Sequence, residues 1–152
     1  MALSQLQQTM AALRITLAEL QHKERQLDML IQQFRTQLRR LPRQVIYGKT
    51  SLDLSLSAMA EIEERLADSL ATRRRLLAIK KAALEELEAL ELIKRVDEAR
   101  SKLENLKQQS QATGLADEIL TEIRGLEQFI AENSKRAEWA ITASYLEQHQ
   151  PG

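Results

Sequence analysis

Residues 3–41 read LSQLQQTMAALRITLAELQHKERQLDMLIQQFRTQLRRL, and their apolar side chains recur at a regular spacing. Written as heptads, eleven of the twelve a and d positions are apolar, and Glu24 at an a position is the exception. Because such a repeat keeps one apolar stripe facing a partner helix, the stretch predicts a coiled-coil helix. The apolar positions are Leu3, Leu6, Met10, Leu13, Leu17, Leu20, Leu27, Ile31, Phe34, Leu38 and Leu41.

The rest of the chain predicts two further long helices separated by short breaks. Pro42 disfavours helical geometry at the residue before it, so the first helix is expected over 4–41. Thr50 and Asp53 resemble a capping box that opens a second helix over 52–111, a range without Gly or Pro. Gly114 then predicts a stop before a third helix over 115–146. The tail, 147–152, is expected to fray.

The short breaks favour antiparallel neighbours. The first helix should cover residues 54–91 of the second, and the third helix should cover 81–111. Both helices should therefore contact residues 81–91 of the second helix. In agreement, the second helix is apolar on more than one side from 76 to 93. Before that window its predicted stripe consists of Leu52, Leu56, Met59, Leu66 and Leu70.

A second apolar line near the start of the first helix is expected to face the end of the third. It consists of Ala11, Ile15 and Ala18, opposite Ala137, Ala140, Ile141 and Ala143. We therefore predict a single all-α domain over 1–152, an elongated antiparallel coiled coil of three long helices. A short central three-helix section would carry two-helix arms. A homodimer in which the partner supplies the third helix fits the same pattern.

Composition argues against several classes of function. Lys and Arg number 22, and so do Asp and Glu, so the chain lacks the net positive charge typical of nucleic-acid binders. It contains no cysteine and only 3% aromatic residues. Glu19 and His22 have the spacing of a di-iron motif but lack the second motif that such a site needs. No catalytic signature is recognisable, so we expect no enzyme, no metal and no cofactor.

The N-terminus has no basic region ahead of an apolar run, and no run of about 18 apolar residues occurs. These features predict a cytoplasmic protein without a targeting segment.

Two regions are candidates for binding a partner. The first break brings Val45, Ile46 and Tyr47 beside a basic cluster that includes Arg39, Arg40 and Arg43. The simpler interpretation, which we favour for the arginines, is that bases near a helix C-terminus complement its dipole. The most aromatic stretch contains Trp139 and Tyr145, which either cap the central section or anchor a partner.

Glu24 is expected to lie opposite residues 70–73, where Arg73 interrupts the stripe of the second helix. An ion pair between them would set the register of the two helices. Alternatively, Glu24 bends out to water.

The pattern as a whole predicts a non-enzymatic coiled-coil scaffold or adaptor that acts through protein–protein contacts, including self-association. The alternative is a peripheral membrane protein of the helical-hairpin kind. In that case residues 1–21, which carry only Arg14 and Glu19 as charges, would lie on lipid as an amphipathic helix.

Overall fold

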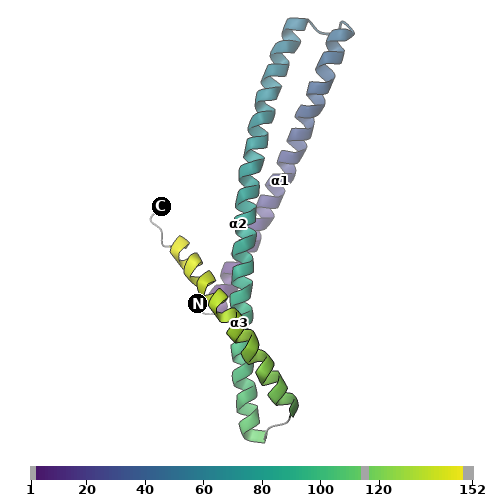
Figure 1. Cartoon of the computed structure of the whole chain (residues 1–152). Helices are drawn as coiled ribbons and strands as arrows, with labels where there is room; N and C mark the ends of the chain where they lie inside the picture. Colours follow the sequence, from purple (N-terminus) through teal and green to yellow (C-terminus); the bar gives the residue numbers. More distant parts are fainter. Residues whose placement is uncertain (1–2, 114–116, 149–152) are drawn as a thin grey trace. The chain divides into compact units, whose positions relative to one another are not determined.

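The computed structural model describes the backbone of residues 3–113 and 117–148, and the side chains of 4–111 and 117–139. The described chain is all-α. It consists of α1 (Leu3–Ile46), α2 (Leu52–Thr113) and α3 (Asp117–Gln148). Helix α2 packs antiparallel to both of its neighbours in the sequence (Figure 1).

The first helix passes through Pro42, so the predicted end at residue 41 is wrong. Proline removes one backbone hydrogen bond, but the residues after it still form theirs. Helix α1 ends at Ile46, and Gly48, two residues later, has a φ of 70°. The Lys49 and Gly48 amides donate to the Gln44 and Val45 carbonyls, the bond pattern of a Schellman motif. The left-handed conformation of Gly48 lets its own amide and that of Lys49 satisfy two terminal carbonyls, so Gly48 is the true stop signal.

The cap of α2 also differs from the prediction. The Ser51 hydroxyl accepts a hydrogen bond from the Leu54 amide at 3.2 Å, so Ser51 is the N-cap in place of Thr50. With Leu54 at the third helical position, no capping box forms. The turn between α1 and α2 is thus Tyr47–Ser51, several residues later than Pro42 suggested. That delay shifts the register of the two helices.

The chain divides into two compact units. The hairpin unit, Ile15–Ala83, contains the turn and the facing parts of α1 and α2. Its heptad positions on α1 are all buried or half-buried, as the repeat requires. On α2 the most buried positions recur every seven residues at Ser55, Ile62, Ser69, Leu76 and Ala83. The predicted stripe through Leu52 and Leu56 is wrong at its start, because both side chains are exposed.

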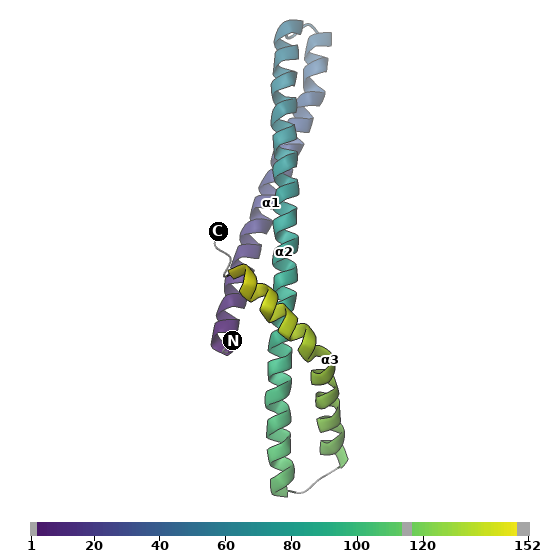
Figure 2. The same cartoon turned by 60° about the vertical axis from the view of Figure 1, so that its left-hand side comes forward.

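The three-helix unit, Met1–Arg14 with Leu84–Gly152, has its own core. One buried cluster joins side chains from all three helices: Leu6, Met10, Leu90, Ile93, Val96 and Ala137. Figure 2 shows α3 folding back along the C-terminal part of α2. Two interhelical ion pairs, Lys102–Glu122 at 3.0 Å and Lys107–Glu127 at 3.4 Å, connect these helices beyond the cluster.

This core includes Leu90, at the end of the predicted 81–91, but it extends later on α2, since Leu84 is exposed while Val96 is 1% exposed. The later turn explains the shift. The predicted second line on α1 is also wrong: Ala11, Ile15 and Ala18 are exposed. Ala137 instead joins the cluster of Leu6 and Met10, which belong to the heptad stripe itself.

The side chains of Ala140, Ile141, Ala143 and Tyr145 lie outside the described residues, as do the predicted stop at Gly114 and residues 149–152 of the predicted tail. The first two residues of that tail, 147–148, are helical in α3, so the predicted end at 146 is wrong. Within the described part of the chain, no helix is both long and apolar enough to cross a membrane.

Candidate binding surfaces

Glu24 lies in a group of four charged side chains between α1 and α2 of the hairpin unit. The Lys80 ammonium is 2.9 Å from Glu24 Oε2, and Arg73 Nη2 is 3.8 Å from Glu24 Oε1. Arg73 Nε also donates to Asp28 Oδ1 at 2.7 Å. The Glu24 side chain is only 18% exposed, so this acid is largely removed from water with two bases beside it. The structure thus places Glu24 next to Arg73 and adds two further partners.

Lys80 and Asp28 were not predicted as partners, because a turn that starts at Pro42 gives a different alignment of the two helices. Their spacing contains a usable signal. Arg73 and Lys80 are seven residues apart, and Glu24 and Asp28 are four apart, so each pair lies on one face of its helix. Two acids therefore face two bases across the seam.

The hairpin tip, residues 39–56, is the second surface. Ile46 and Tyr47 are exposed and Val45 is half-buried. Arg39, Arg40 and Arg43 are exposed as well. Lys49, which was not predicted as a binding residue, adds an exposed base in the turn itself.

Three leucines on the first turns of α2 enlarge the apolar part of the hairpin tip. Leu52, Leu54 and Leu56 are between 55% and 68% exposed. These leucines were not predicted as tip residues, because the apolar pattern placed Leu52 and Leu56 in the seam, where Ser55 lies instead. A serine in a seam position gives no hydrophobic signal, so only packing distinguishes the two alignments.

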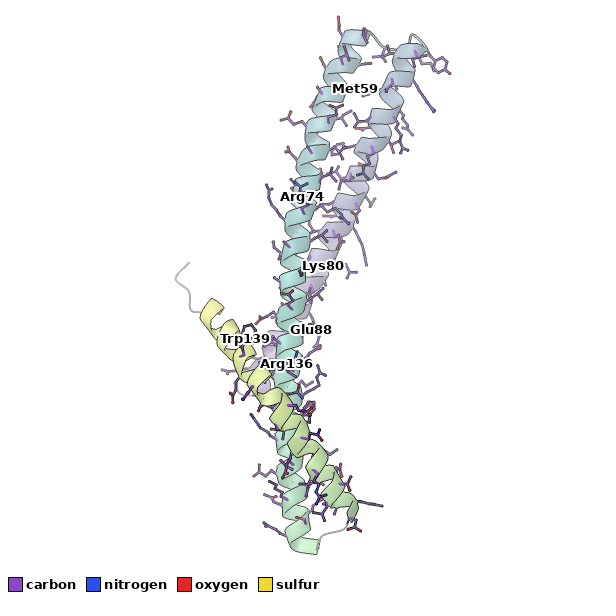
Figure 3. All side chains as sticks on the ribbon, viewed as in Figure 1. Met59, Arg74, Lys80, Glu88, Arg136 and Trp139 are labelled. Atoms are coloured by element: carbon purple, nitrogen blue, oxygen red, sulfur yellow. The ribbon has the colours of Figure 1, made fainter. Side chains whose placement is uncertain are left out.

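Trp139 lies in the three-helix unit beside an open groove of about 760 Å³ between α2 and α3. Ala89 and Leu92 of α2 form the apolar part of its lining, and Trp139 is 75% exposed at its side. Figure 3 shows Glu88 on α2 and Arg136 and Trp139 on α3 in this region. We call this surface the Trp139 groove.

The two walls of the Trp139 groove carry opposite charges. Helix α2 supplies the acids Glu85, Glu88 and Glu91 and the single base Arg95, so its wall is acidic on balance, and α3 supplies Lys135 and Arg136. Glu91 forms an ion pair with Arg14 at 3.7 Å. The groove therefore combines an exposed aromatic side chain with an acidic and a basic wall. Such a combination suits a protein partner whose surface carries both charged and apolar side chains.

Two apolar side chains of the segment 1–21 lie in the core of the three-helix unit. Leu6 is fully buried and Met10 is 2% exposed. Lipid contact through this face of the helix would require both to leave the cluster.

Among the described residues, no group of three or more His, Asp or Glu side chains is placed to hold a metal ion. Comparison of the chain with protein-family models, curated proteins and solved structures found no match.

Proposed function

We propose that this chain is a non-enzymatic coiled-coil scaffold or adaptor, and that it self-associates through the Trp139 groove. The observation that supports this function most directly is the exposure of Trp139 beside a groove with walls of opposite charge. Tryptophan is enriched among the residues that dominate the energy of protein interfaces. The finer architecture belongs to the same proposal: an antiparallel coiled coil with a central three-helix section and two-helix arms.

A second copy of the chain is the partner that the charges favour. In a two-fold symmetric dimer, each copy presents the same surface to the other. The acidic wall on α2 of one copy would then lie beside the basic wall on α3 of the other. Trp139 of each copy would cover the Ala89 and Leu92 region of its partner. An adaptor that recruits a different protein would need that protein to supply both signs of charge.

Self-association is tested by light-scattering mass across a range of protein concentrations. We expect a monomer–dimer equilibrium that Trp139→Ala shifts toward monomer by about tenfold or more, as for a central aromatic anchor. Since Trp139 is the single tryptophan, its emission should shift to shorter wavelength as dimer forms. Ile15→Ala, which removes an exposed side chain outside the groove, is the control.

Charge reversal makes the test specific for the two walls. Glu85→Lys with Glu88→Lys gives two basic walls, and Lys135→Glu with Arg136→Glu gives two acidic walls. Each double variant alone should remain monomeric because like charges meet in its dimer. An equimolar mixture should form a heterodimer. A monomeric natural chain at all concentrations, or charge variants that dimerise unchanged, would refute self-association through this groove.

A further inference from the structure

We infer that the hairpin tip binds the surface of anionic phospholipid membranes, with its apolar end inserted among the lipids and its arginines at the headgroups. This inference concerns a different surface from the Trp139 groove. It stands or falls independently of the proposed self-association.

The first support is the concentration of exposed apolar side chains at the hairpin tip. Eleven large apolar residues are exposed in the part of the chain whose side chains are described, and five of them fall between residues 46 and 56. They are Ile46, Tyr47, Leu52, Leu54 and Leu56. Clusters of this kind mark contact sites for proteins or membranes.

The second support is how these side chains are distributed. Leu52 and Leu54 are two residues apart, so they point about 200° away from each other around α2. Ile46 and Tyr47 add apolar surface at the end of α1 and in the turn. Apolar groups therefore surround the end of the hairpin and do not form one stripe. A partner helix or groove covers one side of a helix, whereas a lipid interface contacts an inserted end from every side.

The third support is the position of the bases. Residues 39–56 contain four bases, Arg39, Arg40, Arg43 and Lys49, against the single acid Asp53. At 1.5 Å per residue, Arg43 and Arg39 lie about 4.5 and 10 Å back along α1 from Ile46. Amphipathic segments enter the boundary between headgroups and acyl chains by about 5–10 Å. Insertion of the apolar end would thus bring the guanidinium groups level with the lipid phosphates.

The turn is also fixed before any membrane is met. The Gly48 amide donates a hydrogen bond to the Val45 carbonyl, and the Leu54 amide donates one to the Ser51 hydroxyl. These two hydrogen bonds hold the end of α1 and the start of α2. Binding then requires little ordering of the backbone. A second copy is a poor occupant of the same surface, because two tips with an excess of positive charge repel each other.

Vesicle flotation with the full chain tests this inference. We expect binding to vesicles of phosphatidylcholine with roughly one third phosphatidylserine, little binding to pure phosphatidylcholine, and release in about 0.5 M salt. Absence of binding to anionic vesicles at low salt would overturn the inference. Equal binding to both vesicle types would also overturn it.

Two pairs of substitutions locate the contact. Ile46→Ser with Leu54→Ser, and Arg40→Gln with Arg43→Gln, should each lower the partition constant by about tenfold or more. The matched controls are Ile15→Ser with Met29→Ser, and Arg74→Gln with Arg75→Gln, which change equally exposed residues outside the tip. Circular dichroism verifies that each variant stays helical. Tip variants that bind like the natural chain would overturn the inference, even where vesicles are bound through another segment.

A spectroscopic variant reports insertion directly. Tyr47→Trp combined with Trp139→Phe moves the single tryptophan to the tip. Its emission should shift to shorter wavelength on anionic vesicles and be quenched by lipids brominated on their acyl chains. The natural chain, whose tryptophan lies in the groove, should show neither change. Unchanged emission from the tip variant on bound vesicles would exclude insertion.

Discussion

Ser55 is a buried seam residue that the apolar pattern of the sequence does not reveal. It is 1% exposed in the seam of the hairpin unit, and its Oγ has no hydrogen-bond partner among the described residues. A buried polar atom without a partner costs about 1–3 kcal/mol. This residue keeps the seven-residue spacing of the α2 stripe at the expense of stability.

Ser55→Ala is therefore expected to stabilise the protein by about 1–2 kcal/mol, because it removes the unpaired hydroxyl and raises helix propensity. Ser57→Ala is the matched control: Ser57 lies in the same helix turn but is exposed, so only propensity changes, by about 0.5 kcal/mol. Urea unfolding of the three proteins measures both values. Equal effects of the two substitutions would show that Ser55 is satisfied in solution.

At the scale of elements, the ends of the helices and the contacts across the seam define the hairpin. Gly48 ends α1 in a left-handed conformation, whereas Gly125 lies inside α3. An added Cβ would meet no atom within 4 Å at either glycine. The same substitution should therefore have opposite effects at the two positions, because only backbone conformation differs.

Gly48→Ala is expected to lower the free energy of unfolding by about 1–2 kcal/mol, the cost of a left-handed conformation with a Cβ. Gly125→Ala should raise it by about 0.5–1 kcal/mol, since alanine favours the helix interior. Thermal unfolding followed by circular dichroism checks both signs. A loss of stability from both substitutions would mean that Gly125 is constrained by a contact absent from the described residues.

The charged group around Glu24 connects α1 and α2 more effectively than a surface ion pair. Glu24→Gln is expected to cost about 1–2 kcal/mol, because Lys80 and Arg73 lose a largely buried partner. Glu61→Gln is the control. The Glu61–Arg65 pair is shorter, at 2.7 Å, but more than half exposed, so its loss should cost at most about 0.5 kcal/mol. Chemical unfolding that gives equal costs would argue against a register-setting role for Glu24.

For the molecule as a whole, the division into two units has a consequence for stability. The cluster around Leu90 belongs to the three-helix unit, whereas Leu27, 6% exposed, lies in the hairpin unit. Helices α1 and α2 run through both units without a break. Local opening in one unit need not require opening in the other, because each has its own buried side chains.

Leu90→Ala is expected to destabilise the three-helix unit by about 2–4 kcal/mol through the cavity that it leaves. Amide hydrogen exchange should accelerate in residues 84–113 more than in 15–83. Leu27→Ala should give the reverse pattern. Mass spectrometry of proteolytic fragments after exchange resolves the two segments. Uniform acceleration throughout the chain by either variant would show that the units unfold together.

The sequence alone determined that the chain is helical and which side of α1 is buried. The spacing of Leu6, Met10, Leu27 and Ile31 is a property of the chain, and any helix places such residues on one face. The sequence also predicted that Glu24 lies opposite Arg73, which agrees with the contact in the structure. It indicated Ile46, Tyr47 and Trp139 as candidate binding residues, and all three are exposed.

The alignment of α2 against α1, by contrast, depends on how the helices pack. Pro42 and Gly48 are both residues at which a helix can end. Which of them ends α1 depends on the hydrogen bonds formed at the helix end. The end of α1 near Gly48 sets which residues of α2 face α1. Ser55 is therefore buried, while Leu52 and Leu56 are exposed. A leucine has the same hydrophobicity in either place. Its environment is set by the neighbouring helix, and a single helix does not encode where that neighbour lies.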